Sequence, residues 1–234
     1  MVLLFNRIDK KIFMSEKLNV VIIDYDMGNV RSIENAVRHV GNFNIEVSSC
    51  PETISNADCI ILPGVGAYPD AMKKLNERDL VSTLNNEVLG NKKPVLGICL
   101  GMQLLFDYSE EIMKTSGLGW IPGGVKYMKP GKEYRVPHVG WNSLKVKEGS
   151  DVFSHLGDDK DFYFVHSLCA ECPSEFIEAT CEYGIEVTAA VRKENIFGMQ
   201  FHPEKSQTNG LSTIRKFLEY SMQEAKKRET EFNA

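Results

Sequence analysis

Two patterns of hydrophobic and polar residues alternate along the first half of the chain. Apolar runs of strand length occur at Asn19–Asp24, Asn44–Ser48, Asp58–Leu62 and Pro94–Ile98. Segments with apolar residues at helical spacing occur between or after them, at Val30–Val40, Tyr68–Leu89 and Leu100–Tyr108. Continuous apolar strands are typical of parallel sheets that helices cover on both faces. The order of strands and helices therefore predicts an α/β fold with a mostly parallel central sheet.

The second half of the chain is more broken. Gly and Pro punctuate residues 117–140. Shorter runs follow, which predict strands of a mixed sheet, at Phe162–Val165, Phe176–Thr180, Val187–Arg192 and Asn195–Gln200. Apolar spacing in Gly210–Ala225 predicts a final helix with Leu211, Ile214, Phe217 and Leu218 on its inner side.

We expect a single domain at residues 18–226, because the sequence shows no internal repeat and no linker. Residues 1–17 are expected to be an extension that is disordered or that stems from a misassigned start, since Met14 opens a second plausible start. The positive charges there follow the apolar residues, which is the reverse of a signal peptide. Residues 227–234 are expected to form a charged tail that frays in solvent.

Composition limits the partners that the chain could have. Of its 234 residues, 43% are hydrophobic and 25% are charged, and the net charge is −5. This acidic balance favours neither nucleic acid nor anionic lipid as a partner. The apolar runs are far shorter than the roughly 20 residues that span a bilayer, so we expect a cytoplasmic protein without a membrane partner. The six cysteines indicate packed thiols with at most one reactive group, and no disulfide framework.

Cys99 stands where a buried strand is expected to meet a helix, in Gly97-Ile98-Cys99-Leu100-Gly101. A nucleophile on such a sharp turn needs small flanking residues, which the two glycines supply. The helix N-terminus would favour a thiolate, and the amide of Leu100 would point at a developing oxyanion. Taken alone, this pattern is equally consistent with a buried structural cysteine.

His202 and Glu204 supply the groups that a cysteine nucleophile needs. His202 follows a predicted strand, Pro203 forces a sharp exit, and Glu204 comes two residues later. A cysteine nucleophile needs a base, and the base needs a carboxylate that orients it. The order Cys…His-x-Glu therefore favours a catalytic triad over a structural cysteine and an isolated loop histidine.

Leu62-Pro63-Gly64-Val65-Gly66 follows the third predicted strand. Gly64 and Gly66 permit unusual backbone conformations, and a free amide of this segment could complete an oxyanion hole. From these residues alone, a plain turn between a strand and a helix is the commoner explanation.

Together these motifs resemble a known family. The segments GICLGMQLL, PGVG and GMQFHPEKS are similar to those of class I (triad) glutamine amidotransferases. More narrowly, DYDMGNVRS, VPHVGWNSL and YFVHS resemble the glutaminase subunits of imidazole glycerol phosphate synthases. The resemblance covers roughly residues 18–222 and implies the three-layer, flavodoxin-like fold of that family.

The resemblance also implies roles for individual residues. Cys99 would attack the amide of L-glutamine, His202 would carry protons and Glu204 would orient His202. Gln103 would hold the amino-acid end of the substrate, as would the backbone around Gly66 and Ser167. Together with Gly64, Val65 and Leu100, these positions form the expected substrate and oxyanion site, with no cofactor and no metal.

A partner follows from the same resemblance. The family passes ammonia to a (β/α)8-barrel synthase subunit, which implies a heterodimer that forms imidazole glycerol phosphate in histidine biosynthesis. Asn29, Trp141 and Tyr163 would lie near the shared interface. For Trp141, the sequence alone favours an ordinary core aromatic residue.

One departure from the family keeps alternatives open. After YFVHS the family usually continues with an aromatic residue, whereas this chain has Leu168 and Cys169. The spacing His166-x2-Cys169-x2-Cys172 is a weak zinc pattern, so packed thiols are preferred. The alternatives are a paralogue that supplies ammonia for amidino groups of bacterial surface sugars, and a regulatory scaffold without activity. The intact triad argues against the scaffold.

Overall fold

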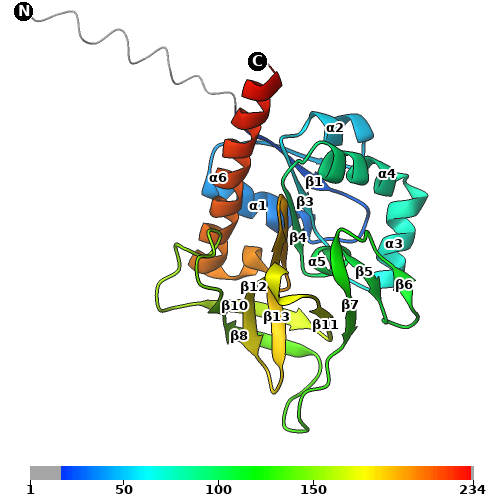
Figure 1. The fold of residues 1–234 in the computed structure, drawn as a ribbon, viewed down its shortest axis with the longest axis vertical. Helices are drawn as coiled ribbons and strands as arrows, with labels where there is room; N and C mark the ends of the chain where they lie inside the picture. The colour runs from blue at the N-terminus through cyan, green and yellow to red at the C-terminus, as the bar shows by residue number, and fades with distance from the viewer. Residues whose placement is uncertain (1–16, 233–234) are drawn as a thin grey trace, which may run out of the picture.

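A computed structural model describes residues 17–232, so residues 1–16 of the expected extension lie outside the described part. The centre is an eight-stranded sheet (Figure 1). In spatial order its strands are β2 (Asn44–Ser48), β1 (Asn19–Ile23), β3 (Cys59–Leu62), β4 (Val95–Ile98), β14 (Ile196–Met199), β13 (Glu186–Lys193), β12 (Ile177–Glu182) and β9 (Lys145–Val146). The strands from β2 to β14 pair in parallel and the rest pair antiparallel, which confirms the mostly parallel sheet.

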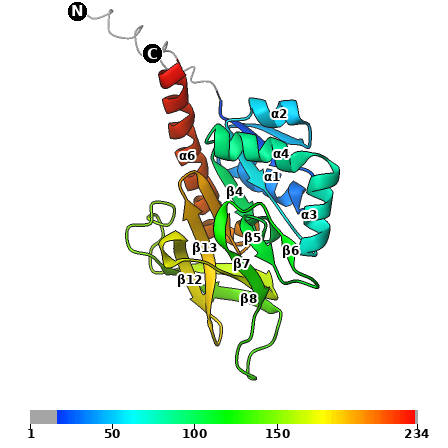
Figure 2. The same cartoon turned by 45° about the vertical axis from the view of Figure 1, so that its right-hand side comes forward.

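Helices cover both faces of this sheet (Figures 1 and 2). One face carries α1 (Val30–Val40) and α6 (Gln207–Phe232). The other carries α2 (Pro51–Asn56), α3 (Tyr68–Glu77), α4 (Leu80–Asn85), the π-helical turn η1 (Asn86–Gly90) and α5 (Leu100–Gln103). The expected helical segment Tyr68–Leu89 is therefore two helices and a π turn.

The packing of β1 shows why its sequence is apolar throughout. Successive side chains of a strand point to opposite faces. Val20 and Ile22 belong to the core under α1 and α6, whereas Val21 and Ile23 belong to the core under α3 and α4. All four side chains are fully buried. The burial of this strand on both faces confirms the interpretation of its apolar run.

Two smaller sheets flank the centre. β8 (His138–Ser143) pairs with β10 (Asp161–His166). A four-stranded sheet contains β11 (Leu168–Glu171), β7 (Ile121–Tyr127), β5 (Phe106–Ser109) and β6 (Thr115–Ser116). Strand β7 and the start of β8 thus lie within the segment that Gly and Pro punctuate. Two short 3-10 turns, η2 (Ser174–Phe176) and η3 (Pro203–Lys205), complete the described elements.

The predicted helix Leu100–Tyr108 was wrong beyond its first turn. The helix ends at Gln103, and Phe106–Ser109 forms strand β5. Phe106 and Ser109 are buried while Asp107 is exposed, because β5 pairs with β6 and β7. Those partners lie later in the chain, and the short apolar run fits a helix equally well.

The predicted end of the last helix was also wrong. Helix α6 runs to Phe232, through most of the segment expected to fray. Arg228 donates to the backbone carbonyls of Asp58 at 2.9 Å and of Lys92 at 3.5 Å. These contacts attach the final turns of the helix to the amino ends of β3 and β4.

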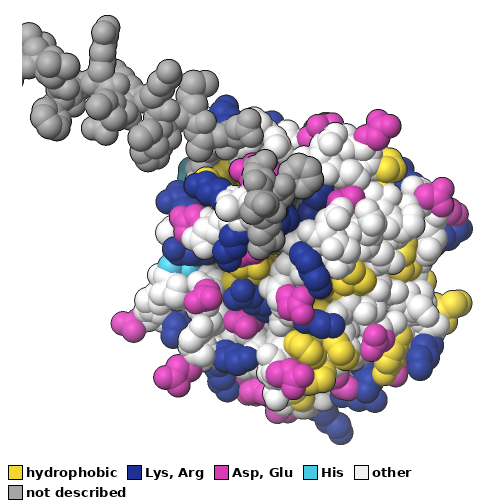
Figure 3. Space-filling model, turned by 45° about the horizontal axis from the view of Figure 1, so that its top comes forward, with side chains coloured by type: hydrophobic (Ala, Val, Ile, Leu, Met, Phe, Trp, Pro, Cys, Tyr) yellow, Lys and Arg dark blue, Asp and Glu magenta, His cyan; other side chains and the backbone are white. Residues whose placement is uncertain are grey.

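Charged side chains of both signs are mixed on one face of the molecule. On the face drawn in Figure 3, Lys and Arg side chains lie among Asp and Glu side chains. Within residues 17–232, no helix combines the length and the apolar character that crossing a bilayer requires.

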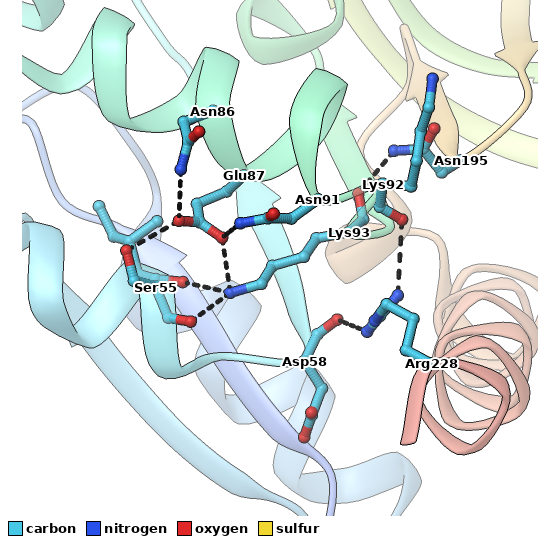
Figure 4. Close-up of polar contacts among 10 residues, drawn as sticks. Ser55, Asp58, Asn86, Glu87, Asn91, Lys92, Lys93, Asn195 and Arg228 are labelled. Carbon is cyan, nitrogen blue, oxygen red and sulfur yellow. Dashed lines mark hydrogen bonds and ion pairs between the residues drawn. The ribbon is translucent and has the colours of Figure 1, made fainter. Parts of the chain in front are cut away.

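A buried ion pair fixes the amino end of β4 (Figure 4). Lys93 Nζ lies 2.8 Å from Glu87 Oε2, and both side chains are at most 10% exposed. Lys93 also donates to the carbonyls of Ile54 and Ser55, and Glu87 accepts from Ser55, Asn86 and Asn91. Burial raises the pKa of Glu87, but these hydrogen bonds and Lys93 outweigh it and hold the pKa below its usual value. This ion pair therefore links η1 and α2 to the start of β4.

Replacing Lys93 with Met should destabilise the fold strongly, because it leaves the Glu87 carboxylate buried without its cation. The expected loss is about 3–5 kcal/mol in the free energy of unfolding, measured by urea denaturation at neutral pH. Lys92→Met is the matched control, since its ion pair with Glu194 is exposed and should contribute less than about 1 kcal/mol. Equal losses in the two variants would contradict this account.

Candidate active site

Cys99 occupies a sharp turn between β4 and α5. Its φ is 54° and its ψ is −112°, a conformation that costs energy for a residue with a side chain. Backbone packs against backbone on either side of it. A Cβ atom on Gly101 would lie 1.9 Å from the carbonyl oxygen of Leu62, and one on Gly97 would lie 2.6 Å from that of Gly101. The two glycines are therefore required by the close approach of β3, β4 and α5.

Strand β14 brings a second group of residues to the same place. It pairs with β4 in parallel, with Met199 opposite Ile98. The amide of Cys99 donates to the carbonyl of Met199 at 2.7 Å. Residues that follow β14 therefore leave the sheet beside the turn at Cys99.

His202 and Glu204 come together in the segment after β14. His202 Nδ1 lies 2.9 Å from Glu204 Oε1, and the two side chains are 3% and 0% exposed. The backbone of His202 is held at both ends, since its amide donates to Tyr163 O at 2.9 Å and its carbonyl accepts from Ser206 Oγ at 2.7 Å. Glu204 Oε2 has no hydrogen-bond partner among the described residues.

The surroundings make His202 an unusually strong base. Burial lowers the pKa of its imidazole, but hydrogen bonds and charges from Cys99 and Glu204 outweigh burial and raise the pKa to about 9. An imidazole in this position can take a proton from the thiol and remain stable as an imidazolium. The arrangement can therefore support a thiolate nucleophile.

A cavity of about 290 Å³ opens in front of Cys99. It is lined by Val65, Gly66, Cys99, Leu100, Gln103, Glu111, Val165, His166, Ser167, Leu168, His202 and Lys205. The set contains Cys99, His202 and most of the residues expected to hold substrate. It also contains one carboxylate and one ammonium group.

The Pro63–Gly66 segment divides between the cavity and the core. Val65 and Gly66 line the cavity, and Gly66 has a φ of +103°. Gly64 does not line it, because a Cβ atom there would lie 2.6 Å from the amide nitrogen of Gly101. The amide of Val65 donates to Met27 O at 3.3 Å, so in this state it is not available to an oxyanion.

Gln103 and Ser167 both line the cavity. The amide nitrogen of Gln103 donates to Gln200 Oε1 at 3.0 Å and to Leu168 O at 3.5 Å. A contact between Gln103 and a ligand would therefore use its remaining amide oxygen. Leu168, part of the departure from the family, contributes to the cavity beside Ser167.

The three expected interface residues differ in position. Asn29 donates to Glu204 Oε1 at 3.4 Å, so it reaches the carboxylate of the site. Trp141 and Tyr163 are opposite each other on β8 and β10, with ring centroids 6.1 Å apart. Trp141 is 48% exposed, which makes the core-aromatic interpretation wrong. A Trp on a two-stranded sheet is buried only if something covers that face.

Several residues of the site were not expected from the sequence. Glu111 lines the cavity and accepts from the amide of Tyr68 at 2.6 Å. Gln200 is fully buried, and its amide nitrogen lies 3.9 Å from Cys99 Sγ. The position of Gln200 two residues before His202 was the available signal. For Glu111, one carboxylate among many in the chain, the sequence offered none.

The two cysteines of the departure pack against the hydrophobic cores, Cys169 in one and Cys172 at the edge of the other. Cys169 and Cys181 are buried, and burial raises the pKa of Cys181 to about 12. His166 points elsewhere, with Nδ1 2.8 Å from Leu168 O. Among residues 17–232, no group of three or more His, Cys, Asp or Glu side chains is placed to hold a metal ion.

Comparisons with known proteins show which family the chain resembles. The family described as Glutamine amidotransferase class-I matches residues 21–219. Imidazole glycerol phosphate synthase subunit HisH 2 of Vibrio vulnificus (strain YJ016) is 65% identical over 203 residues, which cover 87% of this chain and 95% of the relative. Imidazole glycerol phosphate synthase subunit HisH of Listeria monocytogenes serovar 1/2a is 50% identical over 200 residues, which cover 86% of this chain and 95% of the relative.

Solved structures show the same fold at low identity. PurLQS from Thermotoga maritima has a TM-score of 0.66 at 17% identity, covering 87% of this chain and 99% of that chain. A glutamine amidotransferase from Thermotoga maritima has a TM-score of 0.57 at 19% identity, and the match covers 91% of this chain and 86% of that chain. The described α/β architecture is thus that of class I amidotransferases.

The raised pKa of His202 can be measured directly. Titration of the imidazole by NMR should give a pKa of about 9 in the wild type. In Cys99→Ala the value should fall, because the hydrogen bond and the charge of Cys99 both raise it. His138 is an internal control, since burial lowers its pKa to about 4 and it should stay neutral in both proteins at neutral pH. An unchanged His202 pKa in the variant would show that Cys99 and His202 do not interact.

Proposed function

This chain belongs to the class I glutamine amidotransferase family, and on that premise we propose that Cys99, His202 and Glu204 hydrolyse L-glutamine and release ammonia for a partner subunit. The domain that does so covers residues 18–226, of which the family description matches 21–219. One structural observation carries this proposal. A cysteine on a strained turn and a buried histidine line one cavity, and a buried carboxylate contacts the histidine.

The acceptor of the ammonia follows from the relatives. Proteins 65% and 50% identical to this chain are named as imidazole glycerol phosphate synthase subunits. We therefore assign the chain to the formation of imidazole glycerol phosphate in histidine biosynthesis, in the cytoplasm, as the glutaminase subunit of that synthase. These names favour histidine biosynthesis over the modification of a surface sugar.

Acylation is the first half of the reaction. The thiol proton of Cys99 moves to His202, and the thiolate attacks the side-chain amide carbon of glutamine. His202 then gives its proton to the departing nitrogen, so that ammonia leaves and a γ-glutamyl thioester remains on Cys99. Glu204 keeps the Nδ1 side of the imidazole oriented and stabilises its positive charge.

Deacylation is the second half of the reaction, and His202 again accepts a proton. A water molecule gives a proton to His202 as its oxygen attacks the thioester carbon. The Cys99 thiolate leaves and takes the proton back from His202, and glutamate is released. Both halves need a base beside the sulfur, and His202 serves in both.

The cavity offers groups for both ends of the substrate. Glu111 is the carboxylate that can pair with the α-ammonium group of glutamine, and the free amide oxygen of Gln103 can accept from the same group. Backbone amides near Gly66 and Ser167, with the ammonium of Lys205, are available to the α-carboxylate. The amide of Leu100, at the first position of α5, is placed for the oxyanion.

The partner docks at the mouth of this cavity. Exposed apolar side chains gather on neighbouring β8 and β10, namely Val139, Trp141 and Val165, and Val65 lies at the cavity itself. A (β/α)8-barrel subunit seated there would cover the site and receive ammonia without its escape to solvent. Asn29, Trp141 and Tyr163 belong to this interface.

Cys99→Ala should abolish glutamine hydrolysis while the protein stays folded, because the side chain is on a turn at the cavity. Glutamate release by the complex with the synthase subunit measures this. With an ammonium salt in place of glutamine, the same variant complex should still form product, since acceptor chemistry resides in the partner. Glutamine hydrolysis by a folded Cys99→Ala protein would disprove the nucleophile.

The isolated chain should be a poor glutaminase, because the Val65 amide is engaged with Met27 O and cannot serve as a second oxyanion donor. The loss of one such donor typically costs on the order of 10²–10³ in rate. Binding of the partner with its acceptor can select the state in which this peptide is turned toward the site.

Glutamine turnover by the purified chain, measured with and without the synthase subunit and its acceptor ligand, tests this. We expect at least a hundredfold rise, in keeping with the typical cost of one oxyanion donor. Rates within about threefold of each other are too close for a missing donor and would mean that the oxyanion hole is already complete in the free chain.

A further inference from the structure

We propose that the side-chain amide of Gln200 is a second hydrogen-bond donor to the sulfur of Cys99, next to His202, and that Gln103 holds it in this orientation. The inference deepens the function proposed above and depends on Cys99 being the nucleophile. It assigns a catalytic role to a residue that the triad does not include.

The position of Gln200 follows from the sheet. Met199 is opposite Ile98 in the parallel pair of β14 and β4, so Gln200 and Cys99 are the next residues of two adjacent strands. In extended backbone, residues two apart point to the same side. Gln200 and His202 can therefore both face the nucleophile, while Phe201 between them packs in the core.

A backbone carbonyl fixes which end of the amide faces the sulfur. Leu168 O can only accept hydrogen bonds, and it receives one from Gln103 Nε2 at 3.5 Å. The same nitrogen donates to Gln200 Oε1 at 3.0 Å. The amide nitrogen of Gln200 is then the end left for Cys99 Sγ, 3.9 Å away. If the Gln200 amide were flipped, its NH2 group would face the NH2 group of Gln103, and its oxygen would face the sulfur of Cys99.

A pair of buried histidines supports the same carbonyl. His166 Nδ1 lies 2.8 Å from Leu168 O, and His166 Nε2 lies 3.0 Å from His138 Nδ1. Burial lowers the pKa of each imidazole to about 4, so both are neutral at physiological pH. His166 must then carry its proton on Nδ1 and donate to Leu168 O, while its Nε2 accepts from His138. The carbonyl of Leu168 thus accepts from both sides and sets the direction of the hydrogen bonds toward His138 and toward Gln200.

The donor matters most when the sulfur is charged. Hydrogen bonds to ionised groups contribute about twice as much as those between neutral groups, and Gln200 is completely buried, so water does not replace it. Once the thioester forms, the sulfur becomes a poor acceptor. Gln200 therefore favours the thiolate that attacks in the first half of the reaction and that leaves in the second.

Other titratable groups surround the sulfur and must stay constant in a test. Tyr25, whose pKa is raised by burial and by the nearby Cys99, comes from the segment after β1. His166, Glu111 and Lys205 line the cavity, and His202 pairs with Glu204. None of these is altered by a substitution at position 200, so a difference between variants reports on Gln200.

The test is the pH dependence of Cys99 alkylation by iodoacetamide in the full-length chain, followed by mass spectrometry of the Cys99 peptide. Gln200→Met keeps the size of the side chain but removes the donor. We expect alkylation at neutral pH to slow about tenfold and the half-maximal pH to rise by about one unit, the lower range for a bond to a charged group. Gln200→Glu should raise the half-maximal pH further, because a carboxylate repels the thiolate.

Two controls separate this role from a structural one. Met199→Leu changes the neighbouring side chain without touching the sulfur contact and should leave the profile unchanged. Exposed Cys50 of the same molecules reports any difference in reagent. Wild-type profiles in Gln200→Met and Gln200→Glu, whatever their thermal stability, would overturn the role of Gln200. If the wild type also fails to hydrolyse glutamine with its partner, the function itself is wrong, which is a separate outcome.

Discussion

The parallel pairing of β4 with β14 is the constraint on which the whole site depends. One hydrogen bond, from the Cys99 amide to the Met199 carbonyl at 2.7 Å, aligns the ends of the two strands. Cys99 directly follows β4, and Gln200, His202 and Glu204 follow β14. A slip by one residue would turn the side chains of β14 to opposite faces and separate His202 from the sulfur. Helices on both faces of the sheet keep that register, because each strand is buried on both sides.

The opposite ends of the same strands are fixed by polar groups. The Lys93–Glu87 ion pair stands at the amino end of β4, and Asn195 donates to the carbonyls of Val88 and Lys93 at the amino end of β14 (Figure 4). Arg228 attaches α6 to the start of β3 and β4. The chain therefore places its buried structural charges at one end of the sheet and its reactive groups at the other.

Much of this arrangement could be predicted from local sequence, and the limits have physical reasons. The glycines around Cys99 and the Pro after His202 are local requirements of a turn, so both turns can be predicted from the sequence. Strand β5 and the last turns of α6 depend on contacts with distant segments, which local periodicity does not report. The exposure of Trp141 and the contacts of Glu111 and Gln200 likewise depend on residues far away in the chain. The roles of the site residues stay predictions until chemistry tests them.

In the proposed reaction, glutamine is hydrolysed through a covalent intermediate on Cys99. Its most direct test is rapid acid quenching of the complex with the synthase subunit during turnover of isotope-labelled glutamine, followed by peptide mapping. The account predicts a labelled γ-glutamyl thioester on the peptide that contains Cys99. Continued hydrolysis with the label on another cysteine, or with no label on Cys99 at any quench time, would contradict it.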